Sequence, residues 1–153
     1  MKSGTDQDDV RVELMSLRFA QNASERQIRR AVAVAMTKTI ASKAEEQSDK
    51  VPGAVQSTIS LYARLIPSAG KADFLLEAQR DLVRRASGGT ILLHLAKELY
   101  ERDMLEEGDI TSWWNDDRSE LTEDLKLVKA PSRPFLDWLA NAEEESDSES
   151  EEG

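Results

Sequence analysis

Apolar residues recur at helical spacing along almost the whole chain, and this feature most restricts what it can fold into. Val10, Leu14 and Leu17 follow one another at intervals of four and three, which places their side chains on one face of an α-helix. No segment alternates between apolar and polar residues with the period of two that a half-buried strand requires. The sequence therefore predicts an all-α protein.

Turn signals divide this pattern into about eight helices. Ser24 and Gln27 form a Ser-x-x-Gln capping box, which is typical of a helix start, and Pro67 ends the third helix. Pro134 fits the first turn of the last helix, where proline is tolerated. Such short breaks favour antiparallel pairs stacked into a short HEAT-like superhelix, with a compact bundle as the alternative. Four of the later helices are expected at residues 72–86, 90–102, 106–114 and 119–128.

The chain length is that of one domain with a buried core. Its 153 residues are enough to bury roughly two-thirds of the unfolded surface. We expect a flexible acidic lead at residues 1–9, a HEAT-like helical domain at 10–142 and a disordered acidic tail at 143–153, because the tail combines low hydrophobicity with dense charge. No apolar run approaches the ~20 residues of a membrane span, and the polar start is not a signal peptide. The absence of cysteine suits a reducing compartment, and we expect a cytoplasmic location.

Negative charge is concentrated in the C-terminal half of the chain. Residues 143–153 carry −7, and residues 98–124 hold eleven acidic residues against two arginines, which is −9. The net charge is −10, so the remaining residues sum to +6. This distribution argues against nucleic acid as a partner of the C-terminal part, because phosphates would be repelled, and favours a Lys- or Arg-rich partner. Acidity that serves only solubility is the alternative, with about equal weight on charge alone.

The residues that most enzymes need are missing. His94 is the only histidine, so catalytic triads and histidine metal sites lack a second member. It lies between Leu93 and Leu95, which favours a packed or surface position on a helix over a catalytic one. "SGGT" is not followed by the Gly-Lys-Ser/Thr of a phosphate loop. We therefore expect no metal, no cofactor and no bond-making chemistry, and an interaction module is the default.

Three stretches carry a family resemblance. "VELMSLRFAQNAS" occupies residues 12–24, and "ERDMLEEGDITSWW" occupies 101–114, with "FLDWLANAEEESDSES" following at 135–150. Together they resemble the C-terminal domain of the epsilon subunit of eukaryotic translation initiation factor 2B. That domain belongs to the wider two-tryptophan HEAT-like group, which includes C-terminal domains of initiation factors 5 and 4G. The resemblance runs from about residue 10 to the end; Met15 stands where an asparagine is expected.

The resemblance implies a guanine-nucleotide exchange domain that promotes GDP release from initiation factor 2, a three-subunit GTP-binding protein. It implies that the acidic boxes receive lysine-rich segments of the beta subunit of that factor and that the domain contacts the GTP-binding gamma subunit. Other subunits of factor 2B would assemble through the rest of the protein. The functional glutamate of the family falls on Glu13, and its functional tryptophan falls on Trp138.

The residue pattern leaves structural roles open for both positions. Glu13 lies angularly between Leu17 and Ala20, so it is either a contact residue or a charge at the rim of an apolar stripe. Trp138, at helical spacing from Phe135, is either a core residue, as is usual at such spacing, or an exposed binding anchor.

The adjacent residues Trp113 and Trp114 point about 100° apart on a helix. Trp113 continues Ile110 at a spacing of three and is predicted to enter the core, which leaves Trp114 near the acidic face. Ser146 and Ser148 each have an acidic residue three positions later, a pattern that an acid-directed kinase recognises and that acidic tails also match by composition. The predicted partner-binding residues are Trp138, Trp114, Glu106, Glu107, Asp109, Glu143, Glu144 and Glu145.

Two other functions fit the same sequence. A non-catalytic adaptor like that of initiation factor 5 would bind the same lysine-rich segments without exchanging nucleotide. A structural scaffold domain would only hold a larger complex together. Residues 12–18 discriminate between the first two functions, because an exchange domain needs an additional surface for the GTPase.

Overall fold

The computed structural model describes residue 10 and residues 25–152, with side chains described as far as residue 142. No strand occurs in this part of the chain, which confirms the predicted all-α class. The first predicted helix, and Glu13 within it, lie outside the described residues. The α-helices are α2 (Glu25–Ala44), α3 (Val51–Tyr62), α4 (Lys71–Leu82), α5 (Gly88–Glu101), α6 (Glu107–Trp114), α7 (Glu123–Lys129) and α8 (Arg133–Glu152), with 3-10 turns η1 (Ser48–Lys50), η2 (Asp117–Glu120) and η3 (Ala130–Ser132).

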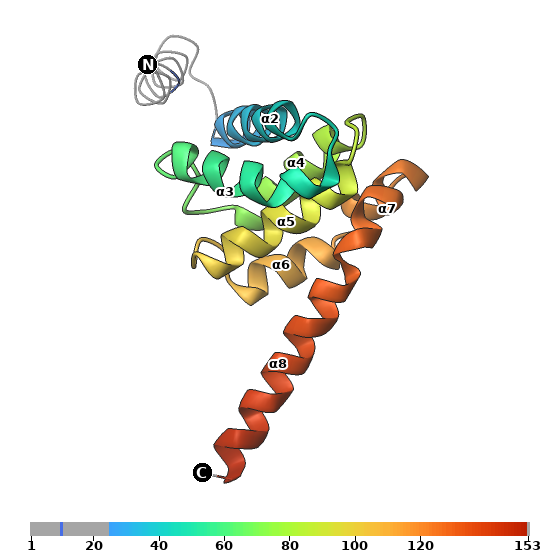
Figure 1. Cartoon of the computed structure of the whole chain (residues 1–153). Helices are drawn as coiled ribbons and strands as arrows, with labels where there is room; N and C mark the ends of the chain where they lie inside the picture. The colour runs from blue at the N-terminus through green and yellow to red at the C-terminus, as the bar shows by residue number, and fades with distance from the viewer. Residues whose placement is uncertain (1–9, 11–24, 153) are drawn as a thin grey trace.

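The helices stack in two adjoining rows (Figure 1). In one row α2 packs on α4 and α4 packs on α6, while in the other α3 packs on α5 and α5 packs on α7. The rows meet where α2 contacts α3 and where α4 contacts α5. The pair α2–α3 therefore lies against the pair α4–α5, and α6 and α7 continue the two rows, as the HEAT-like prediction requires.

The core fills the space between the two rows. Trp113, Phe74 and Met36 are among its largest fully buried side chains. Burial of Trp113, which is 0% exposed, confirms the prediction made from its spacing to Ile110. In the part that the structure describes, no helix is long and apolar enough to cross a membrane.

The junction between α4 and α5 differs from the sequence expectation. The fourth helix was expected to reach Ala86, but α4 ends at Leu82, and α5 begins at Gly88 rather than Thr90. Ser87 has a positive φ of 59° and precedes this start. A side chain at Gly88 would collide with the carbonyl oxygen of Leu82, so only glycine allows this close approach. The "SGG" stretch is thus a tight helix–helix corner in which both glycines already belong to α5.

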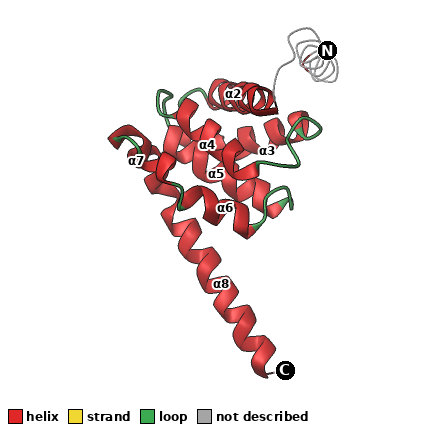
Figure 2. Ribbon diagram, turned by 180° about the vertical axis from the view of Figure 1, so that it is seen from behind, coloured by secondary structure: helices red, strands yellow, loops and turns green. Residues whose placement is uncertain are grey.

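The last helix runs further than the sequence suggested. A disordered tail was expected at residues 143–153, whereas α8 continues through Glu152 and projects away from the rest of the molecule (Figures 1 and 2). Glutamate is a good helix former, and no proline or glycine interrupts residues 143–152, so helical backbone is compatible with this composition. The boundary at residue 142 between the HEAT-like domain and an acidic tail stays a prediction.

A candidate acidic and aromatic docking surface

Trp138 lies on an aromatic cluster that joins α5 to α8. Its ring stacks on Phe135 at a centroid separation of 6.2 Å, and Tyr100 of α5 meets it edge-on at 6.2 Å. Phe135 is 6% exposed and anchors α8, whereas Trp138 is 56% exposed. The position of Trp138, which spacing alone left open between core and surface, is therefore on the surface. An indole held on a rigid aromatic base can contact a partner with little loss of side-chain entropy.

A groove of about 470 Å³ runs beside this indole between α5 and α8. Burial and the charge of Lys97 lower the pKa of His94 below its ordinary value, so this ring is neutral at pH 7. The groove is thus largely apolar, with Lys97 and Glu101 as its charged residues, and it suits an apolar side chain of a partner more than a metal or an anion. Its lining residues are Leu93, His94, Lys97, Glu101, Pro134, Phe135 and Trp138.

Trp114 belongs to a different cluster. Its ring meets Trp113 edge-on at 5.8 Å, and the ammonium of Lys129 lies 4.3 Å from its centroid. Lys129 is buried and donates hydrogen bonds to the carbonyl of Trp114 at 2.6 Å and to Oε1 of Glu120 at 3.0 Å. That hydrogen bond and charge from Lys129 lower the pKa of Glu120. An internal cation therefore already covers the ring of Trp114. Among the described residues, no aromatic contact joins Trp114 to Trp138.

The predicted carboxylates of α6 divide by role. Asp109 accepts a hydrogen bond of 2.9 Å from the backbone N–H of Glu106 and so caps the start of the helix. Glu106 is exposed, and Glu107 is partly buried. The backbone of α8 is helical at the other predicted residues, and the structure does not describe their side chains. These residues are Glu143, Glu144, Glu145, Ser146 and Ser148.

Several carboxylates of residues 98–124 are neutralised within the domain. Glu98 pairs with Arg102 at 2.8 Å, and Glu120 pairs with Lys129. Ion pairs to Arg118 and Lys126 engage two more acidic residues of this stretch, at 2.7 and 3.5 Å. Within residues 98–124, the exposed carboxylates for which the described residues provide no ion pair are Glu101, Asp103, Glu106, Asp117 and Asp124.

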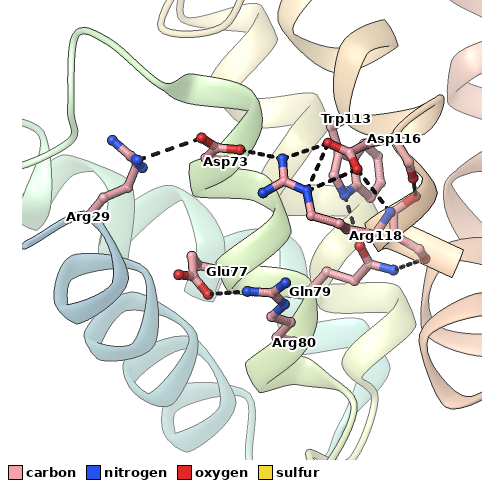
Figure 3. A network of polar contacts seen from close by, with 9 residues as sticks. Arg29, Asp73, Glu77, Gln79, Arg80, Trp113, Asp116 and Arg118 are labelled. Atoms are coloured by element: carbon pink, nitrogen blue, oxygen red, sulfur yellow. Dashed lines mark hydrogen bonds and ion pairs between the residues drawn. The ribbon is translucent and has the colours of Figure 1, made fainter. Parts of the chain in front are cut away.

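Polar networks hold the surface in place, and the sequence analysis did not find them. The buried amide of Gln79 accepts a hydrogen bond of 2.9 Å from Nε1 of Trp113 and donates to the carbonyls of Ser119 and Leu125 at 2.8 and 3.0 Å (Figure 3). One side chain of α4 therefore fastens α6, η2 and α7. A glutamine inside a charged helical stretch carries no signal of this role.

A second network runs over the surface from α2 to η2. Arg118 donates to Asp73 at 2.9 Å and to Asp116 at 2.7 Å, and Arg29 lies 3.6 Å from Asp73 (Figure 3). Hydrogen bonds from the side chain and backbone of Arg118 lower the pKa of Asp116 to about 2. These pairs tie the N-terminal part of the described domain to the turn that precedes α7.

A buried carboxylate lies between α2 and α4. Asp81 is 5% exposed and accepts hydrogen bonds from Thr37 at 2.5 Å, Arg85 at 2.5 Å and Arg84 at 2.6 Å. Burial alone would raise the pKa of Asp81, but hydrogen bonds from Arg85, Thr37 and Arg84 outweigh it and lower the pKa below its ordinary value. Asp81 is thus a fully paired structural anion. Among the described residues, no group of three histidine, cysteine or acidic side chains is placed to hold a metal ion.

Comparison with known proteins identifies the domain. The family model described as W2: eIF4-gamma/eIF5/eIF2-epsilon matches residues 70–149. The chain is 33% identical over 147 residues to the translation initiation factor eIF2B subunit epsilon of Schizosaccharomyces pombe, covering 95% of this chain and 21% of that protein. It is 31% identical over 90 residues to eukaryotic translation initiation factor 5 of Phaseolus vulgaris, covering 58% of this chain and 20% of that protein.

A third relative is eIF5-mimic protein 2 of Pongo abelii, with 39% identity over 54 residues, 35% of this chain and 12% of that protein. The chain spans about a fifth or less of the length of these relatives. The two aromatic clusters and the acidic stretches described above lie within or next to the segment that the family model matches. The chain therefore belongs to the W2 domain family of translation initiation factors.

Proposed function

We propose that the chain is a guanine-nucleotide exchange domain that promotes GDP release from initiation factor 2. The observation that carries this proposal is the extent of the likeness to the epsilon subunit of eIF2B. That alignment covers 95% of the chain, about 145 of 153 residues, and so leaves about eight outside. Residues 12–18, and Glu13 with them, fall inside the alignment. The match to initiation factor 5 covers only 58% of the chain. A match of that length does not need to include residues 12–18.

The described surface supports docking of a lysine-rich segment. We assign this segment to the beta subunit of initiation factor 2. Glu101 at the end of α5, Asp103 just after this helix and Glu106 directly before α6 are exposed. Glu101 also lines the groove beside Trp138. Lysine ammonium groups would pair with these carboxylates while the aliphatic stems lie against the indole. The acidic residues 143–145 would extend this attraction along α8.

Exchange itself requires a second contact, which we assign to Glu13 and the gamma subunit. A domain that bound the GDP-loaded and nucleotide-free GTPase equally would shift no equilibrium. Docking alone is therefore insufficient, and the residues that favour the empty state should differ from those that capture the lysine-rich segment. Assembly with other subunits of factor 2B would occur outside this chain, and a cytoplasmic location follows from this role.

The experiment that tests the proposal measures release of fluorescent GDP from purified initiation factor 2 in the presence of this chain. Faster release that depends on the concentration of the chain supports exchange. Binding to a lysine-rich peptide without any change in release would instead support the adaptor function, which the shared match of residues 70–149 to the family of initiation factor 5 also favours. If the chain neither accelerated GDP release nor bound the peptide, the scaffold function would remain.

The acidic tail offers a place for regulation within this proposal. Phosphate on Ser146 or Ser148 would add about −1.5 to −2 charges each and strengthen attraction to a lysine-rich partner. Mass spectrometry of the native protein tests this, and absence of phosphate at both serines would remove the idea.

A further inference from the structure

A second hollow on the described surface lies between α2 and α4, and no residue of 98–124 lines it. It measures about 740 Å³. Arg30 and Val34 of α2 form one side, and Arg80 and Arg84 of α4 form the other. The docking surface described above uses none of these residues.

The carboxylates in this hollow are already engaged, and the arginines above them are accessible. The side chains of Glu77 and Asp81 are 11% and 2% exposed, whereas those of Arg80 and Arg84 are 39% and 70% exposed. Arg80 contacts Glu77 at 3.3 Å through one nitrogen, and Arg84 contacts Asp81 at 2.6 Å through one nitrogen. Each guanidinium has five N–H donors, so both keep donors that are free to bind an incoming group (Figure 3 shows the Glu77–Arg80 pair facing α2).

The α2 side of the hollow carries Arg30, and two further cations, Arg26 and Lys38, lie on the same helix outside the lining. Arg26, Arg30 and Lys38 are exposed. Arg26 is one helical turn before Arg30, and Lys38 is eight residues after Arg30, about 80° further round the helix. The described residues provide no ion pair or hydrogen bond to any of the three side chains. Two arginines at this spacing repel each other and weaken the helix slightly. Arg30, which the described residues leave without an ion pair, faces Arg80 and Arg84 across the hollow, and three arginines around a concave site are the arrangement expected for an external anion.

We propose that the groove between α2 and α4 binds an acidic protein segment. Carboxylates of that segment would take bidentate hydrogen bonds from Arg30 and Arg84, for which the planar guanidinium fork is suited. An apolar side chain of the segment would lie on Ala31 and Val34, which line the hollow between the arginines. The domain would then have two ends of opposite charge, one for a lysine-rich segment and one for an acidic segment.

The observations favour a peptide over nucleic acid. Two carboxylates lie in the hollow, and the arginines surround a confined site instead of following a long strip at phosphate spacing. The whole chain carries −10, and a long polyanion would extend beyond the groove into that field. A short acidic peptide would not, because charges more than about 8 Å away are screened at physiological salt.

The acidic end of α8 is not the occupant within one molecule. α8 points away from α2 in both views (Figures 1 and 2). If the α8 of a second copy filled the groove, the contact would be heterologous and would build open chains of molecules. We therefore take a separate acidic segment as the partner.

The test uses the full chain and fluorescence anisotropy of a labelled peptide made of aspartate and glutamate with a central leucine. Arg30→Glu should weaken binding about tenfold or more, equivalent to the loss of one good charge pair, and Arg30→Lys should have a smaller effect because it keeps the charge without the fork. Arg64→Glu is the matched control, since Arg64 is exposed and lies outside the hollow. Circular dichroism of each variant checks that the fold is retained.

Four results would overturn the proposal: no binding of the acidic peptide, equal losses in Arg30→Glu and Arg64→Glu, binding of single-stranded RNA in place of the peptide, or self-association that disappears when the chain is cut after Ala142. Binding of a lysine-rich peptide should be unchanged or slightly stronger in Arg30→Glu. The proposal does not depend on nucleotide exchange, so loss of GDP-release activity would leave this result unaffected.

Discussion

The indole N–H of Trp113 and the amide oxygen of Gln79 form a hydrogen bond of 2.9 Å in the centre of the domain. Both side chains are 0% exposed, and the two residues lie on different helices, α6 and α4. The amide nitrogen of Gln79 also holds the carbonyls of Ser119 and Leu125. The buried polar groups of three separate segments are therefore satisfied by one side chain, and the segments that carry Trp114 and the exposed carboxylates depend on it for their position.

Replacement of Gln79 by alanine should destabilise the protein strongly. The indole N–H and two backbone carbonyls would lose their partner in the interior, and each unsatisfied buried group costs about 1–3 kcal/mol. We expect the free energy of unfolding to fall by about 3 kcal/mol. The loss is smaller than the sum for three unsatisfied groups because water that enters the cavity would hydrogen-bond to the carbonyls. Urea denaturation followed by circular dichroism measures this change. Gln56→Ala is the control, because Gln56 is exposed and its loss should change stability by no more than about 0.5 kcal/mol.

The two tryptophans Trp113 and Trp138 should respond oppositely to truncation. Trp113→Ala removes a fully buried ring and should cost about 3–5 kcal/mol of stability. Trp138→Ala removes a ring that is 56% exposed and should cost much less, while it weakens binding to a lysine-rich peptide. Leu121→Ala, at another exposed apolar position, controls for loss of surface area. If neither Trp138→Ala nor Leu121→Ala changed the affinity for the peptide, the indole would not belong to the docking surface.

The core was more predictable from sequence than the site. Trp113 follows Ile110 at helical spacing, and such periodicity directly reports which side of a helix is buried. Gln79 gave no signal, because its partners Ser119 and Leu125 lie 40 and 46 residues away and local patterns do not report distant hydrogen bonds. Trp138 has core-like spacing to Phe135, but α8 has a neighbour on only part of its circumference, which sequence cannot show.

The surface charge that a partner meets was also only partly predictable from the sequence. The count of acidic residues in 98–124 correctly located an acidic region, but Asp109 caps a helix and Glu120 pairs with a buried lysine. Formal charge overstates the charge that a partner meets, because internal pairs consume it. The cations Arg26 and Arg30 show the reverse case: they belong to a stretch with modest net charge, neither has an ion pair to the described residues, and Arg30 lines a hollow.

Stability should fall between about pH 4 and pH 2, and Asp116 should contribute to this loss. The pKa of Asp116 is lowered from 3.8 to about 2 in the folded protein. A carboxyl whose pKa is lower in the folded than in the unfolded protein stabilises the fold at any pH above its unfolded pKa. This contribution is lost as the pH falls through the pKa of the folded protein. Asp116→Asn should therefore lower stability near neutral pH and show a smaller further loss on acidification than wild type. Asp124→Asn, at an exposed carboxylate, should keep the wild-type slope of urea midpoint against pH.

Binding of a lysine-rich peptide should depend steeply on salt and on the acidic residues of the docking surface. At physiological ionic strength the screening length is about 8 Å, so affinity should fall as salt rises. Glu106→Lys together with Glu107→Lys should weaken it further, and the same change at residues 143–145 should act in the same direction. Glu46→Lys with Asp49→Lys is the matched control, since both residues are exposed and lie outside residues 98–124. Titration calorimetry across a salt series that shows no difference between the two double variants would contradict a localised acidic site.

The division between docking and exchange predicts a specific phenotype for Glu13→Ala. If Glu13 contacts the GTPase and the acidic surface only captures the lysine-rich segment, this variant should bind the peptide with wild-type affinity and accelerate GDP release far less than wild type. Trp138→Ala should show the complementary result, with weaker binding and a loss of exchange that higher concentrations of the domain restore. Glu13→Gln separates charge from packing, because it keeps the stem of the side chain and removes the carboxylate. A folded Glu13→Ala protein that releases GDP at the wild-type rate would place the exchange contact elsewhere in the chain.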